Sequence, residues 1–294
     1  MKMLLTRTIA AVTLAAGLAT PAMAHRQWML PSATNFSGED NWVTVDAAVS
    51  NDLFYFEHRP GNIDNVKAIA PDGTTDVPLE NKGKGQYRST FDVHLTQKGT
   101  YRIGSANDML SGSYDLNGKT ERLPRGTTKE TLAEKLPAGA TNVKTSESTS
   151  RNELFITVGE PTTTVFKPTG RGIELVPVSH PNDLVSGEAA TFQFLLDGKP
   201  AADLKVTVIP GGIRYRDQLG QLDLKTGADG KVAITWPTPG MYWVNVSAGG
   251  GRGEGGPGGA EAGEGAAPPP PAAAPAGPPP RRATYITTLE VMAP

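Results

Sequence analysis

The chain has 294 residues, a length that suits one large domain or two of modest size. Its 28 Lys and Arg residues and 30 Asp and Glu residues give a formal net charge of −2, which excludes a strongly basic surface for nucleic acid or for anionic lipid. Cysteine is absent, which excludes disulfides, thiolate metal sites and a lipid-modified cysteine.

The first 24 residues have the pattern of a secretory signal peptide. Lys2 and Arg7 form a positive n-region, and residues 9–18 form an apolar core that is too short to span a bilayer. The sequence Ala-Met-Ala then provides a small-x-small cleavage site that ends at Ala24. We therefore expect export to the periplasm. No second long apolar stretch follows, so we expect no membrane insertion after the signal peptide is cleaved.

Cleavage after Ala24 makes His25 the mature N-terminus. A terminal histidine offers its α-amine and an imidazole nitrogen from one residue, a pair that can chelate a borderline metal such as copper, nickel or zinc. The alternative is that a residue must follow every cleavage site and that this histidine has no role. The junction alone leaves both interpretations open.

The first half of the mature chain has a β-like pattern. Alternating apolar and polar residues, interrupted by turns such as Pro71-Asp72-Gly73, are typical of a β-sandwich. One short helix is expected before Pro137, with Thr127 and Glu130 as a capping box. The polar segment 141–151 is expected to be a loop. Strands are expected at residues 41–49, 66–70, 85–95, 100–104 and 154–159.

The second half has the clearer β pattern. Gly-Lys-Pro, Lys-Val-Thr-Val, Asp-Gly-Lys-Val and Pro-Gly-Met-Tyr follow one another between residues 198 and 242. This order resembles the transthyretin-like and carboxypeptidase-regulatory-like modules of Ig type, a fold that serves many functions. Strands are expected at residues 173–178, 190–196, 204–209, 222–226, 232–236 and 241–246.

Residues 249–280 are mostly Gly, Ala and Pro, a composition that predicts a disordered loop. The alternating segment 282–291 follows it, and we expect this segment to be the last strand and to pair with residues 241–246. The predicted fold is therefore all-β, with two Ig-like or transthyretin-like β-sandwich units and one short helix. The predicted domains span residues 25–165 and 170–294.

Three further histidines lie in the mature chain. His58 ends the aromatic stretch 53–60, where it could lie beside His25 or be part of a packed loop. His94 follows Asp92 on the same strand face, an arrangement that fits a ligand pair or a solvated face. His180 precedes Pro181 in a predicted turn. None of them belongs to a metal motif with fixed spacing, so a site must be assembled in space.

The opening of the mature chain, Ala24-His25-Arg26-Gln27-Trp28-Met29-Leu30-Pro31, is similar to the Ala-His-x-x-Trp-x-x-Pro start of a periplasmic family labelled nickel- or cobalt-transport-associated (NikM-like). Later segments also fit this family, including Pro239-Gly240-Met241-Tyr242 and the closing strand Thr287-Thr288-Leu289-Glu290-Val291. The resemblance covers nearly the whole mature chain. It implies two β-sandwich units and a divalent transition metal, and only His25 matches a position of the motif.

The leading hypothesis is a periplasmic protein that binds Ni²⁺, Co²⁺ or Cu²⁺ for uptake or handling, with a membrane transporter as partner. Its proposed ligands are His25, His94 and His58. The alternative is a module that binds a protein or a glycan without metal and stacks sugars on exposed aromatic rings. An enzyme is not expected, because no nucleophile or nucleotide motif is present and because an N-terminal-histidine copper oxygenase needs a second histidine and a flat face. The aromatic rings considered for sugar stacking are Trp28, Trp42, Tyr55 and Trp243.

Overall fold

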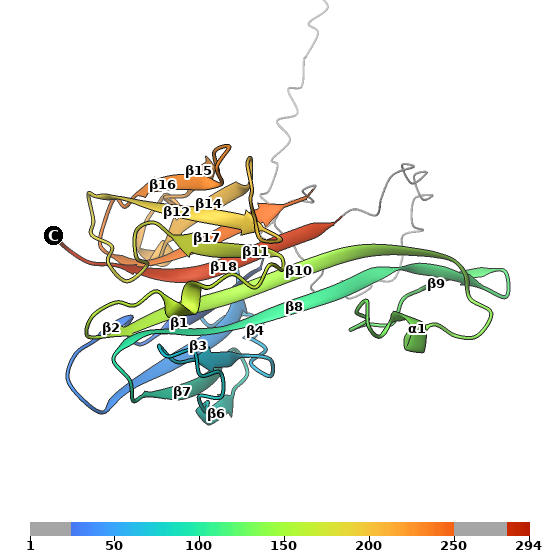
Figure 1. Ribbon diagram of the computed structural model, residues 1–294, viewed down its shortest axis with the longest axis horizontal. Helices are drawn as coiled ribbons and strands as arrows, with labels where there is room; N and C mark the ends of the chain where they lie inside the picture. Colours follow the sequence, from blue (N-terminus) through green and yellow to red (C-terminus); the bar gives the residue numbers. More distant parts are fainter. Residues whose placement is uncertain (1–24, 250–280) are drawn as a thin grey trace, which may run out of the picture.

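The structure, a computed structural model, describes residues 25–249 and 281–294. These residues form almost only β-structure, arranged in three layers (Figure 1), so the predicted all-β class is confirmed. The predicted signal peptide and nearly all of the predicted disordered loop lie outside the described ranges. No helix in those ranges is both long and apolar enough to cross a membrane.

The first outer layer is a five-stranded sheet with the order β1-β3-β7-β6, in which β4 pairs with the end of β3. Every second side chain of β7 points to the inner face of this sheet. Ser89, Phe91, Val93 and Leu95 are buried there, while the residues between them are half-buried. Its strands are β1 (Arg26–Pro31), β3 (Asn41–Ser50), β4 (Arg59–Pro60), β6 (Glu80–Lys84) and β7 (Ser89–Leu95).

The middle layer is a nine-stranded sheet that draws strands from both halves of the chain. Its order is β15-β14-β17-β18-β10-β8-β5, and β2 and β9 pair with β10 and β8. Its strands are β2 (Asn35–Phe36), β5 (Lys67–Ile69), β8 (Gly99–Leu116), β9 (Lys119–Arg122), β10 (Thr141–Val158), β14 (Lys205–Pro210), β15 (Leu222–Lys225), β17 (Gly240–Ala248) and β18 (Arg282–Val291).

The second outer layer is a small sheet in which β12 pairs with β11, β13 and β16. Its strands are β11 (Ile173–Pro177), β12 (Ala189–Leu196), β13 (Lys199–Pro200) and β16 (Lys231–Thr235). The helical elements in the described ranges are short: α1 (Leu132–Lys135), η1 (Thr164–Phe166) and η2 (Ile213–Tyr215).

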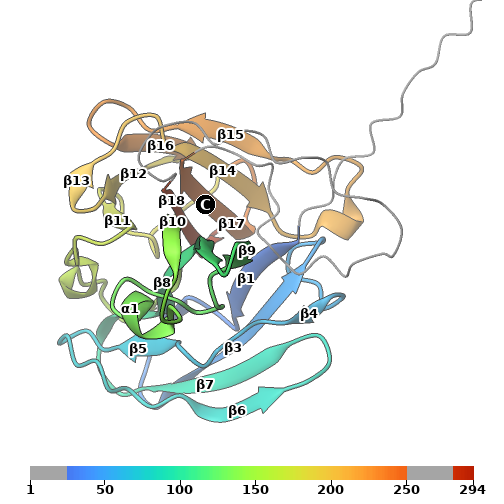
Figure 2. The same ribbon diagram turned by 90° about the vertical axis from the view of Figure 1, so that its right-hand side faces the viewer.

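Two hydrophobic cores lie on opposite faces of the middle sheet. In Figure 2, β8, β10 and β18 of this sheet lie between β3 and β7 on one side and β12 and β16 on the other. Alternation along β10 serves both cores, since Leu154 and Ile156 face the first outer sheet while Phe155 faces the second. The two β-sandwiches therefore share one continuous sheet. Val165 and Phe166, near the predicted domain boundary, pack in the second core.

A third, smaller cluster joins the two halves beside the start of the mature chain. Trp28 and Trp243 are its largest side chains, and both are almost fully buried. Phe54 and Phe56, from the loop between β3 and β4, pack against it. This cluster fixes the position of that loop relative to β1.

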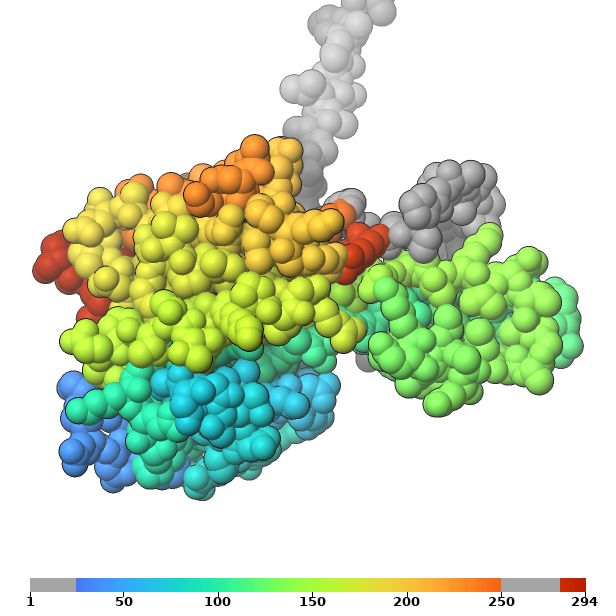
Figure 3. Space-filling view, in the orientation of Figure 1, coloured from blue at the N-terminus to red at the C-terminus, as the bar shows by residue number. Residues whose placement is uncertain are grey.

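Strands β8 and β10 extend far beyond the body of the molecule and form an arm (Figures 1 and 3). Their antiparallel ladder runs from the Thr141–Asp115 pair to the Val158–Gly99 pair, with one irregularity. The prediction of a loop at residues 141–151 was therefore wrong. Both faces of the outer arm are largely solvated, so the strand needs no apolar alternation there.

Two other predictions differ in outcome. The last strand is confirmed, because β18 pairs with β17 from Gly240–Val291 to Ala248–Ala283. The predicted capping box was wrong: α1 is one turn that begins after Thr131, and no side chain caps it. Thr127 is instead fully buried and donates its hydroxyl to the carbonyl of Pro124.

Candidate metal-binding site

His25 lies immediately before β1, and both edges of β1 are held. On one side, β1 pairs with β3, with Arg26 opposite Ser50. On the other side, side chains of the middle sheet bind its carbonyl oxygens: Trp243 Nε1 donates to Gln27 at 3.0 Å, and Thr288 Oγ1 donates to Met29 at 2.6 Å. The backbone that carries His25 is therefore fixed by contacts from both halves of the chain.

His58 lies immediately before β4, on the other side of β3. Val49 of β3 pairs with Gln27 of β1 and with Arg59 of β4, so β3 runs between the two strands that follow the histidines. Two neighbouring strands on either side of a third lie about 10 Å apart. His25 and His58 thus flank the same end of β3, close enough for their side chains to meet.

The two imidazole rings stack face to face, with 3.7 Å between their centroids and 18° between their planes. Both residues are exposed. Partial burial and the neighbouring His25 lower the pKa of His58 below its ordinary value of 6.5. The neutral imidazole that metal binding requires is therefore the stable form of His58 at neutral pH.

Stacked rings direct their nitrogen lone pairs side by side, whereas a shared metal needs lone pairs that converge. One ring must therefore rotate about its side-chain torsions before both nitrogens can bind one ion. Exposed side chains change rotamer on the picosecond to nanosecond timescale, so this rotation has a low barrier. The arrangement brings two ligands together without fixing them in a coordinating geometry.

His94 lies elsewhere. Its Nε2 contacts Asp40 Oδ1 at 2.7 Å, and its ring stacks on Trp42 at 4.2 Å between centroids. Trp42 and Ser50 lie at opposite ends of β3, about 26 Å apart at the rise of a strand. The structure therefore separates His94 from the pair at His25. Asp92, the suggested partner of His94, accepts hydrogen bonds from Thr44 and Asn81 instead.

Within residues 25–249 and 281–294 no group of three or more His, Asp or Glu side chains is arranged to hold a metal ion. The two carboxylates of the loop that carries His58, those of Asp52 and Glu57, are already engaged. Both form ion pairs with Arg214, and Glu57 also accepts hydrogen bonds from the backbone N–H groups of Asn51 and Asp52. These two carboxylates are therefore not free to bind a metal at the histidine pair.

The expectation that four aromatic rings could stack on a sugar is half wrong. Trp28 and Trp243 are only 0% and 3% exposed, because they form the cluster that joins the two halves. Trp42 is 40% exposed, and Tyr55 is half-buried. These two rings belong to different ends of the first outer sheet, since Tyr55 lies in the loop after β3 and Trp42 near the start of that strand.

His180 is a structural residue of the junction between the halves. Its Nδ1 accepts a hydrogen bond from the backbone N–H of Asn182 at 3.2 Å. Its Nε2 lies 3.1 Å from the hydroxyl of Thr100 and 3.3 Å from the carbonyl of Thr162. Burial lowers its pKa below 6.5, against the opposing effects of Thr162 and Asp183. A proton on Nδ1 would turn this atom into a donor that faces the backbone N–H of Asn182, which is also a donor.

We expect His180→Gln to flatten the dependence of stability on pH between about pH 7 and pH 5. The unfolded chain binds the proton more readily than the folded chain, so the free energy of unfolding of the wild type falls as the pH drops below 6.5. One such proton contributes at most about 1.4 kcal/mol per pH unit. Urea unfolding at pH 7.5 and 5.5 measures this slope, with His94→Gln as control. Equal slopes for wild type and His180→Gln would contradict the expectation.

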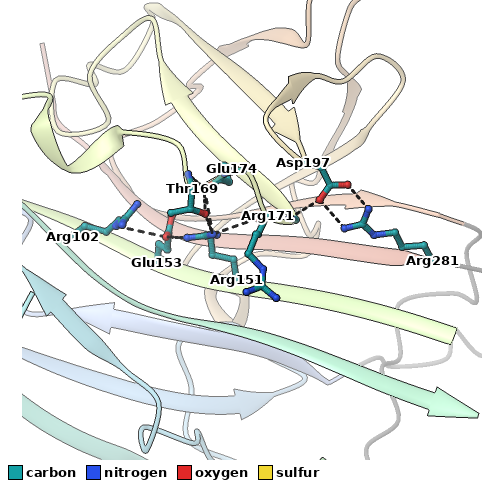
Figure 4. Close-up of polar contacts among 10 residues, drawn as sticks. Arg102, Arg151, Glu153, Thr169, Arg171, Glu174, Asp197 and Arg281 are labelled. Atoms are coloured by element: carbon teal, nitrogen blue, oxygen red, sulfur yellow. Dashed lines mark hydrogen bonds and ion pairs between the residues drawn. The ribbon is translucent and has the colours of Figure 1, made fainter. Parts of the chain in front are cut away.

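A second polar cluster joins β10 to the second outer sheet (Figure 4). Arg151 is 9% exposed and lies between two buried carboxylates, 3.0 Å from Glu153 and 3.3 Å from Glu174. Burial opposes ionisation of Glu174, but hydrogen bonds from Thr169 and Gly170 and the charge of Arg151 outweigh it and hold its pKa below the ordinary value of 4.5. Every charge of this network is paired, which is typical of a structural tie.

A half-open hollow of about 230 Å³ lies beside this network, at the root of the arm. Arg151 and Arg171 line it, but the first is bound by two glutamates and the second pairs with Asp108. Thr149 also lines it, and the hydroxyl of this residue is buried and has no partner among the described residues. These groups therefore present no uncompensated charge to a ligand.

The residues that support the histidine pair could not be predicted from the sequence. Arg214 and Glu57 lie 157 positions apart and form an ion pair of 2.6 Å, for which the sequence contains no signal. The sequence left open whether His58 lies beside His25, because the pairing of β1 and β4 with the same strand is known only from the structure.

Comparisons with known proteins give a family but no activity. A family model described as "Domain of unknown function (DUF4198)" matches residues 22–250. Among solved structures, the D0-D1 domain of intimin is 14% identical, with 74% of this chain and 88% of that chain covered and a TM-score of 0.18. The two tandem V-type regions of a v-region-containing chitin binding protein are 8% identical, with 89% and 98% covered and a TM-score of 0.19. No curated protein matches the chain significantly.

Proposed function

The chain belongs to the family described as domain of unknown function DUF4198, and we propose that it binds a divalent transition metal through His25 and His58 in the periplasm. The observation that carries this proposal is the contact between the two imidazole rings, 3.7 Å apart at the end of β3. The lowered pKa of His58 supports it, because a neutral imidazole is the form that binds metal.

The mature N-terminus supplies the third nitrogen. Cleavage after Ala24 releases the α-amine of His25, and this amine and the His25 imidazole close a chelate ring on one ion. His58 adds a second imidazole after its ring rotates. Three nitrogen donors with a remaining position for water suit Cu(II) and Ni(II) in tetragonal geometry, and affinity follows Co²⁺ < Ni²⁺ < Cu²⁺.

The cellular role follows from export and from the sequence resemblance. A signal peptide delivers the chain to the periplasm, and the resemblance to NikM-like proteins supports capture of nickel, cobalt or copper for a membrane transporter. Both ligands lie at the surface, so an ion held there is accessible to a second protein. We propose binding and transfer of metal, without a catalytic step.

A metal-free interaction module is the second candidate. Trp42 supports it, because this ring is 40% exposed and lies flat against His94, with 4° between the planes. Such a surface can stack on a sugar or on a partner side chain. The burial of Trp28 and Trp243 removes half of the rings on which this candidate depended. The histidine contact therefore favours the metal site.

The test is titration calorimetry with Cu(II) and Ni(II) on signal-processed protein whose N-terminus is verified by mass spectrometry. His58→Ala is expected to weaken binding about 100-fold, or about 2.8 kcal/mol, because one of three nitrogen ligands is lost. One glycine added before His25 turns the chelating amine into an amide and is expected to weaken binding similarly.

His94→Ala is the matched control, because His94 lies at the far end of β3 and its loss should leave the affinity unchanged. Equal affinity of wild type, His58→Ala and the extended protein would refute the proposed site. Loss of binding in His94→Ala alone would move the site to the other end of the sheet.

A further inference from the structure

Arg214 makes the ion pairs that join the loop carrying His58 to the C-terminal half of the chain. Its Nε donates to Asp52 Oδ2 at 3.0 Å, and its Nη2 donates to Glu57 Oε2 at 2.6 Å. The guanidinium also lies 4.3 Å from the centre of the Tyr55 ring. Arg214 therefore contacts the loop at Asp52, Tyr55 and Glu57, and Glu57 directly precedes His58.

Glu57 transmits this contact within the loop. While Oε2 pairs with Arg214, Oε1 accepts hydrogen bonds from the N–H groups of Asn51 at 2.9 Å and Asp52 at 2.7 Å. One carboxylate thus closes the two ends of the loop onto each other. The Arg214 guanidinium restricts the rotation of the Glu57 carboxylate. Because Glu57 directly precedes His58, the position of this carboxylate influences the direction of the backbone at His58.

Arg214 belongs to η2, which lies against the same loop. Gly211 packs so closely on Phe54 that a Cβ atom there would lie 2.9 Å from its ring. Arg216 stiffens the segment internally, with hydrogen bonds to the carbonyls of Pro210 and Gly211. Tyr215 projects from it and is 84% exposed. The segment 211–220 is thus an exposed element in direct contact with the His58 loop.

We propose that Arg214 is a positioning residue that couples metal occupancy at His25 and His58 to the order of the segment 211–220, and this rests on the proposed metal site. A metal that holds His58 fixes the loop 51–58, which holds the Asp52 and Glu57 carboxylates in place for Arg214. By thermodynamic reciprocity, an ordered Arg214 strengthens metal binding to the same extent. A partner that contacts Tyr215 would therefore distinguish the loaded protein from the empty one.

The test compares Arg214→Gln with Arg216→Gln, because Arg216 bonds to carbonyls of its own segment and does not contact the His58 loop. Arg214→Gln is expected to weaken Cu(II) binding about tenfold, as changes next to metal ligands do, while Arg216→Gln leaves it unchanged. Arg214→Lys keeps the positive charge but cannot donate to both carboxylates from two nitrogens, so its Cu(II) affinity should lie between those of the wild type and Arg214→Gln.

Hydrogen exchange of the segment 211–220, with and without Cu(II), provides the readout that a purely structural tie would not change. Cu(II) should slow hydrogen exchange of the segment 211–220 in the wild type, and it should have no effect on the exchange of this segment in Arg214→Gln. An unaltered affinity in Arg214→Gln, or no effect of metal on wild-type exchange in this segment, would overturn the coupling.

The metal-free proteins separate this inference from the metal site itself. Without metal, Arg214→Gln should speed exchange of residues 51–58 several-fold, whereas Arg216→Gln should not. If the wild type binds no Cu(II), the proposed function fails and the coupling fails with it. If Cu(II) binds but residues 51–58 exchange equally in both variants, only the role of Arg214 is refuted.

Discussion

Arg151→Met is expected to lower the free energy of unfolding by about 4 kcal/mol, because it leaves buried charges without their partner. Arg151 lies 3.0 Å from Glu153 and 3.3 Å from Glu174, whose exposed fractions are 5% and 4%. Methionine retains much of the volume of the side chain but no charge. Glu153 keeps one distant partner, Arg102 at 3.9 Å, whereas Glu174 keeps only neutral donors.

The pH dependence of this variant gives a second measurement. Glu174 has a lowered pKa in the folded protein, so its contribution to stability is present above 4.5 and is lost as the pH falls. Without Arg151 its pKa rises toward that of the unfolded chain, so the stability that Glu174 loses on acidification should be smaller in the variant. Urea unfolding from pH 7 to pH 4 tests both effects. The control is Arg122→Met, an exposed arginine of β9, and an equal loss in both variants would contradict the argument.

Trp28→Ala is expected to lower the free energy of unfolding by a similar amount, about 4 kcal/mol, since a fully buried indole leaves a large cavity. Trp28 is 0% exposed and donates its Nε1 to the Ser50 hydroxyl at 2.7 Å. It also contacts the rings of Phe54 and Phe56, each with 5.5 Å between centroids. The substitution therefore removes support for the loop that carries His58.

Trp42→Ala is the matched control, because this tryptophan is 40% exposed and its loss is expected to cost less than about 1.5 kcal/mol. Unfolding in urea, followed by fluorescence of the remaining tryptophans, compares the two. If metal binding holds as proposed, Trp28→Ala should also weaken it while Trp42→Ala should not. Equal destabilisation by both substitutions would show that Trp28 does not anchor the junction.

The strands that were predicted well are those with one buried face. In β7, each buried residue alternates with a more exposed one, and the period of two is visible in the sequence. The pairing of β17 with β18 was predicted across the intervening Gly- and Pro-rich segment, because local alternation continues after it. Burial on one face thus leaves a pattern that requires no knowledge of the neighbouring strand.

The elements that were missed lack such a pattern. The outer part of β10 is solvated on both faces, so its polar residues suggested a loop although the backbone continues the ladder with β8. The parallel pairing of β10 with β18, from Ser148–Arg282 to Glu153–Thr287, joins segments more than 130 residues apart. A parallel pair needs no local turn, and so its sequence contains no turn signal.

For this protein, the all-β class and the main strands could be predicted from the sequence, because each depends on residues close together in the chain. The export signal and the ligand role of His25 are predictions of the same local kind. The tertiary structure alone decided that His58 lies against His25, that His94 lies at the opposite end of β3, and that one sheet serves both sandwiches. These arrangements depend on which strands pair and in which register. Pairing is set by burial summed over the whole fold, so no short segment encodes it.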